Sequence, residues 1–171
     1  MIWNVFRRRK AAASAEQQWW RDAEREAATP TSDGVLRLRA ALSAQSTTSD
    51  HEAQDELLEA MEAVLAAAPA PLPTVTTQHR VIGADACHFT APVTLAAEVG
   101  IPGRLFLTSA RCIFAGGKVQ AWPWHRVRQV LRSGRDVALV VAGQDAHVHI
   151  QTNSYTDALL IVHLSDRLRA R

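Results

Sequence analysis

The sequence predicts an α+β protein, in which a helical N-terminal segment precedes a small, partly open β-barrel of about seven short antiparallel strands capped by a C-terminal helix. Three observations lead to this prediction. Apolar residues recur every three to four positions before residue 70 and every second position between residues 74 and 151. A proline-rich connector at residues 69–73 separates the two patterns. A helical pattern with its own N-cap returns at Ser154.

Three helices are expected in the N-terminal segment. The first covers residues 14–28, because Ser14 and Gln17 form a capping-box pattern. The second covers about 33–44, after a break at Thr29 and Pro30. The third covers about 50–68 and is capped by Ser49. Its apolar stripe consists of Leu57, Leu58, Met61, Val64, Leu65 and Ala68.

After the connector, short strands alternate with turn signals such as adjacent glycines. The candidate strands are 74–82, 86–98, 103–108, 111–115, 118–123, 126–132, 136–142 and 146–151. A final helix is expected from Ser154 to about residue 169, with Asp157 as its capping partner. The sequence therefore predicts two parts, a helical segment at 1–70 and a barrel domain at 71–171.

Composition excludes several classes of protein. The chain has 171 residues, of which 47% are hydrophobic and 21% charged, as in ordinary globular proteins. The two cysteines, Cys87 and Cys112, are too few for a disulfide scaffold and lack metal-ligand spacing. No apolar run approaches the length of a membrane-spanning helix. Nucleophile-elbow, phosphate-loop and zinc-protease motifs are absent from the sequence, so we expect no enzyme and no cofactor.

The first ten residues place apolar side chains before basic ones, which is the reverse of a secretory signal peptide. We therefore expect a cytoplasmic protein, either free or peripheral to the inner face of the membrane. Two interpretations of the terminus stay open: contact with an anionic membrane surface, or a frayed end. The membrane-contact residues would be Trp3, Phe6, Arg7, Arg8, Arg9 and Lys10.

The stretch from Gly103 to Phe114, Gly-Arg-Leu-Phe-Leu-Thr-Ser-Ala-Arg-Cys-Ile-Phe, resembles the strand–turn–strand signature of PH-like domains of the GRAM type, as in bacterial members. The resemblance covers about residues 74–171. It implies a partly open barrel that is capped by the C-terminal helix and used for binding. Relatives bind phosphoinositides, other lipids, peptides or proteins. The lysine- and arginine-rich loop of the phosphoinositide-binding members has no counterpart at residues 80–88, which hold one arginine and one aspartate.

Arginines are dense around the strand predicted at 126–132. Strict alternation places Arg126, Arg128 and Arg132 on one strand face, with Arg135 in the next turn. Three interpretations stay open: an external anion site, a dock for the acidic helix at 50–68, and a solvated face. An anion site would take a lipid headgroup, an acidic peptide or nucleic acid.

Aromatic and histidine pairs supply weaker candidates. Trp122 and Trp124 alternate around Pro123, so they either join the arginines in a contact surface or fill the core. Nucleic-acid binding is the less favoured use of such a surface. His147 and His149 share an outward face, but a metal site needs a third ligand, so no metal is expected.

The sequence thus favours a non-catalytic binding module that recognises a protein partner or an anionic membrane surface. In the alternative, the N-terminal helices mediate assembly and the barrel is structural. The 50–68 stripe would then be exposed in the monomer and available for homo-oligomerisation.

Overall fold

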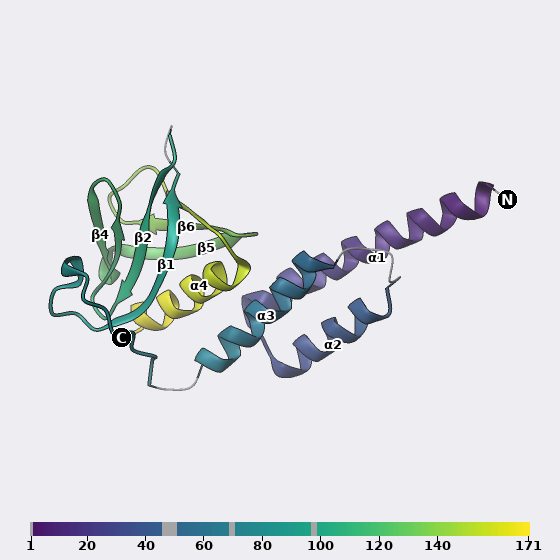
Figure 1. Ribbon diagram of the computed structural model, residues 1–171, viewed down its shortest axis with the longest axis horizontal. Coiled ribbons are helices and arrows are strands. Elements are labelled where there is room, and N and C mark those ends of the chain that lie inside the picture. The colour runs from purple at the N-terminus through teal and green to yellow at the C-terminus, as the bar shows by residue number, and fades with distance from the viewer. Residues whose placement is uncertain (1, 46–50, 69–70, 97–98) are drawn as a thin grey trace. The chain divides into compact units, whose positions relative to one another are not determined.

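The computed structural model describes residues 2–45, 51–68, 71–96 and 99–171, with side chains from residue 13 onward. The chain divides into two compact units, a helical unit at Met1–Ala66 and a barrel unit at Ala67–Arg171. The fold class is the predicted α+β, since helices are followed by a seven-stranded antiparallel sheet and a C-terminal helix (Figure 1).

The helical unit consists of α1 (Ile2–Ala28), α2 (Ser32–Ser43) and α3 (Glu52–Ala67), whose last residue lies past the unit boundary. Trp19 attaches α1 to α2, because its indole Nε1 donates to Leu38 O at 3.0 Å. The prediction that the first helix begins at residue 14 was wrong. The helix begins at Ile2, and Ser14 is an exposed residue inside it. Alanine, arginine and lysine precede Ser14, and these strong helix formers extend the helix past the capping pattern.

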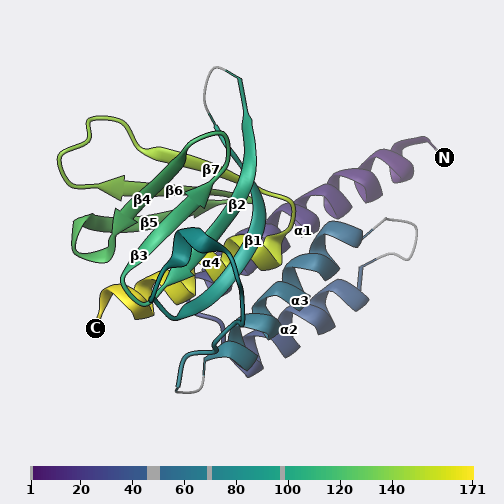
Figure 2. The same cartoon turned by 60° about the vertical axis from the view of Figure 1, so that its left-hand side comes forward.

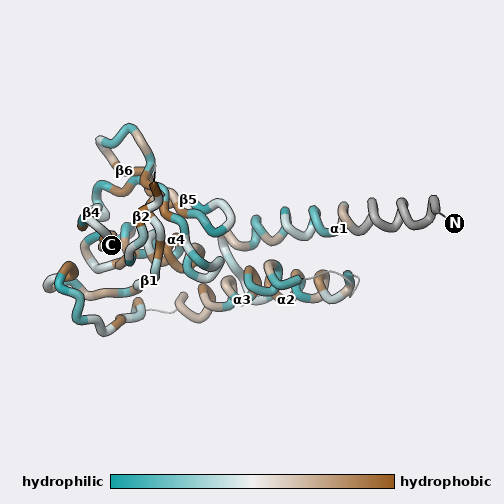
Figure 3. Tube along the Cα trace, turned by 45° about the horizontal axis from the view of Figure 1, so that its top comes forward, coloured by the Kyte–Doolittle hydropathy of each residue, from teal (hydrophilic) through white to brown (hydrophobic). Residues whose placement is uncertain are grey.

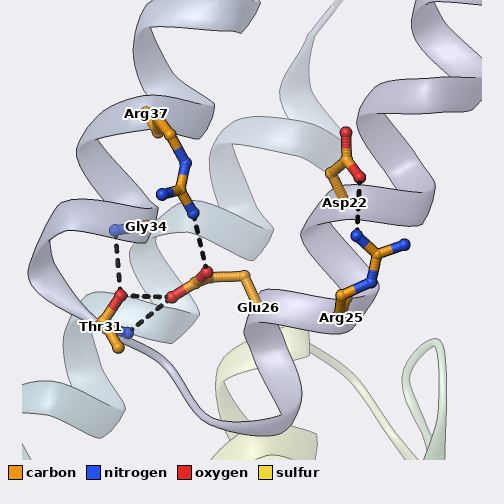
Figure 4. Close-up of polar contacts among 6 residues, drawn as sticks. All are labelled: Asp22, Arg25, Glu26, Thr31, Gly34 and Arg37. Carbon is orange, nitrogen blue, oxygen red and sulfur yellow. Dashed lines mark hydrogen bonds and ion pairs between the residues drawn. The ribbon is translucent and has the colours of Figure 1, made fainter.

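A polar corner fixes the start of α2 (Figure 4). The Thr31 hydroxyl caps the helix by accepting from Gly34 N at 3.0 Å. The Glu26 carboxylate in turn accepts from Thr31 N at 2.9 Å and from Thr31 Oγ1 at 2.6 Å, and it pairs with Arg37 at 3.4 Å. A Cβ on Gly34 would meet this carboxylate at 1.9 Å, so the glycine gives Glu26 the room that it needs.

The apolar stripe of α3 is mostly buried in the single chain. Leu57, Leu58 and Met61 have no exposed surface, whereas Ala68, just beyond the helix, is exposed. The assembly alternative required that this stripe be exposed in the monomer, and that prediction is wrong for these three residues. Self-association itself stays a prediction, and the Ser49 cap lies outside the described residues.

The barrel unit contains one antiparallel sheet in the order β4-β3-β2-β1-β7-β6-β5. Its strands are β1 (Cys87–Leu95), β2 (Ile101–Thr108), β3 (Arg111–Ala115), β4 (Val119–Pro123), β5 (Val127–Ser133), β6 (Asp136–Val141) and β7 (Val148–Thr152). Within the described residues β4 and β5 do not pair, so both remain edges and the barrel stays open. Figure 2 shows the sheet curling around the C-terminal helix.

That helix, α4 (Tyr155–Arg169), closes the core as predicted. Ser154 is its N-cap and accepts from Asp157 N at 3.0 Å. The helix contributes Ala158, Ile161 and Leu164 to a core that takes residues from all seven strands. The hydrophobic stretches in Figure 3 accordingly gather in the strands and in α4.

The prediction of a strand at 74–82 was wrong, because this segment does not join the sheet. The segment makes one strand-like hydrogen bond, from Val75 N to Cys87 O at 2.8 Å, and then turns into a short 3-10 helix, η1 (Arg80–Ile82). Gly83 ends η1 with φ of 65°, a conformation that glycine adopts without steric cost. Residues 74–86, called the outer segment below, pack Val75, Val81 and Ile82 against Phe106 and Ile113. Alternate residues of the same strands face α4, so the outer segment covers the opposite face of the sheet.

Candidate functional site

The outer edge of β5 is the main candidate binding site, because its backbone is open to one more strand. β5 is the last strand in the sheet and, within the described chain, pairs only with β6. In an antiparallel pair every second residue of an edge strand turns its N–H and C=O away from the partner strand. Such an edge is a template for one more extended chain.

A bulge changes which β5 residues face outward. The pairing with β6 shifts register between Val127 and Gln129, and the buried residues are Val127 and Val130, three positions apart. An extra residue in one strand reverses the inward and outward alternation that follows it. Placing Arg126, Arg128 and Arg132 on one strand face was therefore wrong. Arg126 also precedes the strand, in a second 3-10 turn, η2 (Trp124–Arg126).

The four arginines are spread along the edge instead of forming one cluster. At one end, Arg126 Nη2 donates to Ala142 O at 2.9 Å. At the turn that joins β5 and β6, Arg132 Nη1 donates to Gly134 O at 2.7 Å, and the Arg135 guanidinium lies 5.1 Å from the Tyr155 ring centroid. Arg128 is exposed, and its guanidinium has no partner among the described residues. A strand of this length places its ends about 20 Å apart.

Helix α4 occupies the beginning of the edge. Arg169 Nε donates to Val127 O at 2.9 Å, and Arg169 Nη2 donates to Arg128 O. The rest of β5, residues 129–133, carries the exposed side chain of Leu131, which is 41% accessible. Residues 124–135 include four arginines and no aspartate or glutamate, and the first acidic residue after them is Asp136, which pairs with Ser133 at the end of the strand.

Trp122 and Trp124 are core residues. They are 4% and 6% exposed and belong to the main hydrophobic cluster. Trp124 Nε1 also donates to Thr108 O at 2.7 Å. Of the two interpretations left open for this pair, a place in the core is confirmed and a contact-surface role is wrong, because both rings complete the inner layer of the barrel.

The other predicted sites gain no support as ligand sites. The side chains of Trp3, Phe6, Arg7, Arg8, Arg9 and Lys10 lie outside the described residues, so their membrane contact stays a prediction. In the part of the chain that the structure describes, no helix is both long and apolar enough to span a bilayer. The His147 and His149 rings lie 6.2 Å apart, and across the described ranges no three metal-ligating side chains come together.

Both cysteines are free and buried. Burial raises the pKa of the Cys87 thiol and raises the pKa of the Cys112 thiol still further. A high pKa keeps a thiol protonated, which disfavours its use as a nucleophile.

The sequence reasoning missed two hollows beside the outer segment. One, of about 520 Å³, is open and is lined by residues between 74 and 87. The other, of about 450 Å³, lies between the outer segment and the outward side chains of β1 and β2. The alternating pattern at 74–82 indicated a strand, and a strand in the sheet would have left no such space.

Comparison with known proteins gives weak structural likeness. No protein-family model matches the chain, and no curated protein matches it. Among solved structures, Inner Membrane Complex Sub-compartment Protein 3 from Toxoplasma gondii is 15% identical with a TM-score of 0.42, over 47% of this chain and 74% of that one. Sub-compartment Protein 1 of the same organism is 17% identical with a TM-score of 0.40, over 60% of this chain and all of that one (100%).

A further match is a chain from the ternary complex of human RhoA, its inhibitor and the DH/PH domain of human ARHGEF11. It is 10% identical with a TM-score of 0.44, over 83% of this chain and 48% of that one. One of the three structures named here thus contains a PH domain, and none of the three addresses the GRAM type or a bacterial origin.

Proposed function

We propose that this protein is a non-catalytic binding module of the PH-like kind, and that it takes an extended, acidic segment of a protein partner along the β5 edge. The observation behind the proposal is the outer side of β5 at residues 129–133, which no strand of the described chain pairs, with Arg128, Arg132 and Arg135 along it and the exposed Leu131 within it. A cytoplasmic location and the GRAM-type relationship belong to the same proposal.

The spacing of the arginines favours an extended partner over a compact anion. A lipid headgroup or a free phosphate needs several cations converging on one point, whereas Arg126 and Arg135 lie at opposite ends of β5. An added strand along residues 129–133 would run past Arg128, Arg132 and Arg135, and its acidic side chains would lie beside them in turn. Backbone hydrogen bonds would supply affinity, and the arginines would supply charge complementarity.

The other edge of the sheet is less suited to this role. β4 is shorter than β5, ends in Pro123, and begins beside one cation, Lys118. Proline removes a backbone donor, which shortens the usable edge.

Fluorescence anisotropy of a short labelled peptide in which aspartate and valine alternate tests the proposal. We expect saturable binding of this peptide and little binding of a matched peptide with asparagine in place of aspartate. Arg128→Glu should weaken binding roughly three- to tenfold, because an exposed ion pair is worth up to about 1 kcal/mol and the substitution reverses the charge. Lys118→Glu, an equal charge change on another hairpin, should leave binding nearly unchanged.

Sedimentation with neutral and anionic vesicles tests the competing hypothesis, that the arginines bind a membrane surface. Binding to anionic vesicles that Arg128→Glu abolishes, together with no binding of the peptide, would overturn the proposal in favour of a membrane surface. Equal binding of the aspartate and asparagine peptides would also contradict it, because the arginines would then have no role.

A further inference from the structure

A hollow of about 450 Å³ lies on the opposite face of the sheet from α4. It is lined by Val75, Thr76, Thr77, Gln78 and His79 of the outer segment and by Thr90, Arg104 and Phe106 of the strands. This volume is within the range of sites that hold small organic molecules. None of these residues belongs to the β5 edge.

The strand register explains why these side chains meet. Thr90 pairs with Phe106 in the ladder between β1 and β2, and Arg104 lies two residues before Phe106 on the same face of β2. Leu105 and Leu107, which alternate with them, belong to the core beneath α4. One wall of the hollow is therefore part of the sheet itself.

The opposite wall is fixed at both ends of its polar stretch. At its start, Val75 N donates to Cys87 O at 2.8 Å, and the ring of His88 lies with Nδ1 2.7 Å from Pro73 O. At its end, the His79 ring packs on Phe106 with the ring centroids 4.9 Å apart. Between these two points the segment lines the hollow with two threonines and a glutamine.

Arg104 is an exposed residue, and none of the residues that line the hollow carries a negative charge to pair with it. Within the described residues Arg104 forms no ion pair, and its one hydrogen bond is a long one, to Thr90 Oγ1 at 3.5 Å. Arg111, at the start of β3, differs, because its Nε pairs with Asp85 at 3.0 Å. No acidic residue lines the hollow, while Thr76, Thr77 and Gln78 add neutral hydrogen-bonding groups.

We propose that this hollow binds a small organic acid, with its carboxylate on the Arg104 guanidinium and its apolar part against Val75 and His79. The planar guanidinium matches a carboxylate in a bidentate pair. A single guanidinium balances one negative charge, whereas a phosphomonoester brings about 1.5 to 2. The hydroxyl and amide groups of the outer segment would orient the rest of the ligand.

Titration of the full-length, ¹⁵N-labelled protein with benzoate, followed by NMR, tests the proposal. Benzoate should give saturable shifts at the Thr76–His79 amides and at Arg104 Nε–H, and benzamide, which has the same ring without the charge, should give much smaller shifts. Arg104→Gln should weaken benzoate binding about two- to fivefold, because it removes the charged half of an exposed pair that is worth up to about 1 kcal/mol. Arg128→Gln is the matched control and should leave benzoate binding unchanged.

Three results would overturn the proposal: no saturable shifts at these residues, equal shifts with benzamide, or unchanged binding in Arg104→Gln. Larger shifts with inorganic phosphate than with benzoate would show that the carboxylate assignment is wrong. The two proposals fail separately, because Arg104→Gln should not alter binding of the acidic peptide and Arg128→Glu should not alter binding of benzoate.

Discussion

The indole of Trp124 donates a hydrogen bond to the backbone oxygen of Thr108 at 2.7 Å, which ties the turn before β5 to the end of β2. Thr108 is fully buried, so no water replaces this donor. Trp124 N also donates to Ala110 O at 3.1 Å, and the two bonds together fix where β5 begins.

Trp124→Phe should therefore destabilise the barrel unit. The ring would still fill space, but Thr108 O would lose its donor, at a cost of about 1–3 kcal/mol in the free energy of unfolding. Trp122→Phe is the control, because the Trp122 indole is equally buried and makes no hydrogen bond with the described residues. Urea denaturation followed by near-ultraviolet circular dichroism measures both. Equal losses in the two variants would contradict a role for the hydrogen bond.

Gly103→Ala should also destabilise the sheet. A Cβ at this position would lie 2.6 Å from both Ala115 O and the Phe114 ring, so β2 and β3 would have to separate. Overpacking of this kind costs about 1–3 kcal/mol. Gly117→Ala is the matched control, because its Cβ would meet nothing within 4 Å, and thermal denaturation of both variants checks the difference. A melting temperature lowered equally by both substitutions would show that the close approach at Gly103 is not responsible.

The elements that the sequence predicted well have strong local signals. The α4 cap at Ser154 and Asp157 formed as expected, because both partners lie within one turn of helix. The strand at 111–115 was confirmed at both ends, and the remaining strands after residue 85 differ by a few residues. Glycine-rich turns divide the hairpins in the sequence itself, so their positions depend little on the rest of the fold.

The errors concern features that depend on distant residues. The β5 bulge reverses the alternation around Arg128, and it arises from pairing with β6, not from a residue type in β5. Trp122 and Trp124 become core residues only because β3 and α4 close around them. The hollow beside Arg104 needs an outer segment that leaves the sheet after Val75, and its alternating residues do not indicate that departure.

The reactivity of the two thiols should show how completely the folded barrel unit buries them. Burial raises the pKa of both thiols, so at pH 8 each holds less reactive thiolate than an exposed cysteine. We expect Ellman's reagent to react slowly with folded protein and rapidly with both thiols in urea, and Cys87→Ala and Cys112→Ala assign the two rates. Because the folded-state pKa values are raised, the unfolded thiols ionise first, and stability should fall as the pH rises above the ordinary range for a thiol. Fast labelling of Cys112 in the folded Cys87→Ala variant would contradict this burial.

Amide hydrogen exchange of the full-length protein, with and without the alternating aspartate–valine peptide, tests the central claim most directly. If the peptide adds a strand to β5, the outward-facing amides among residues 129–133 will exchange more slowly when it is bound, and those of β4 will not change. The protection should disappear in Arg128→Glu. Peptide binding that protects β4, or that leaves the amides of β5 exchanging as before, would contradict the account.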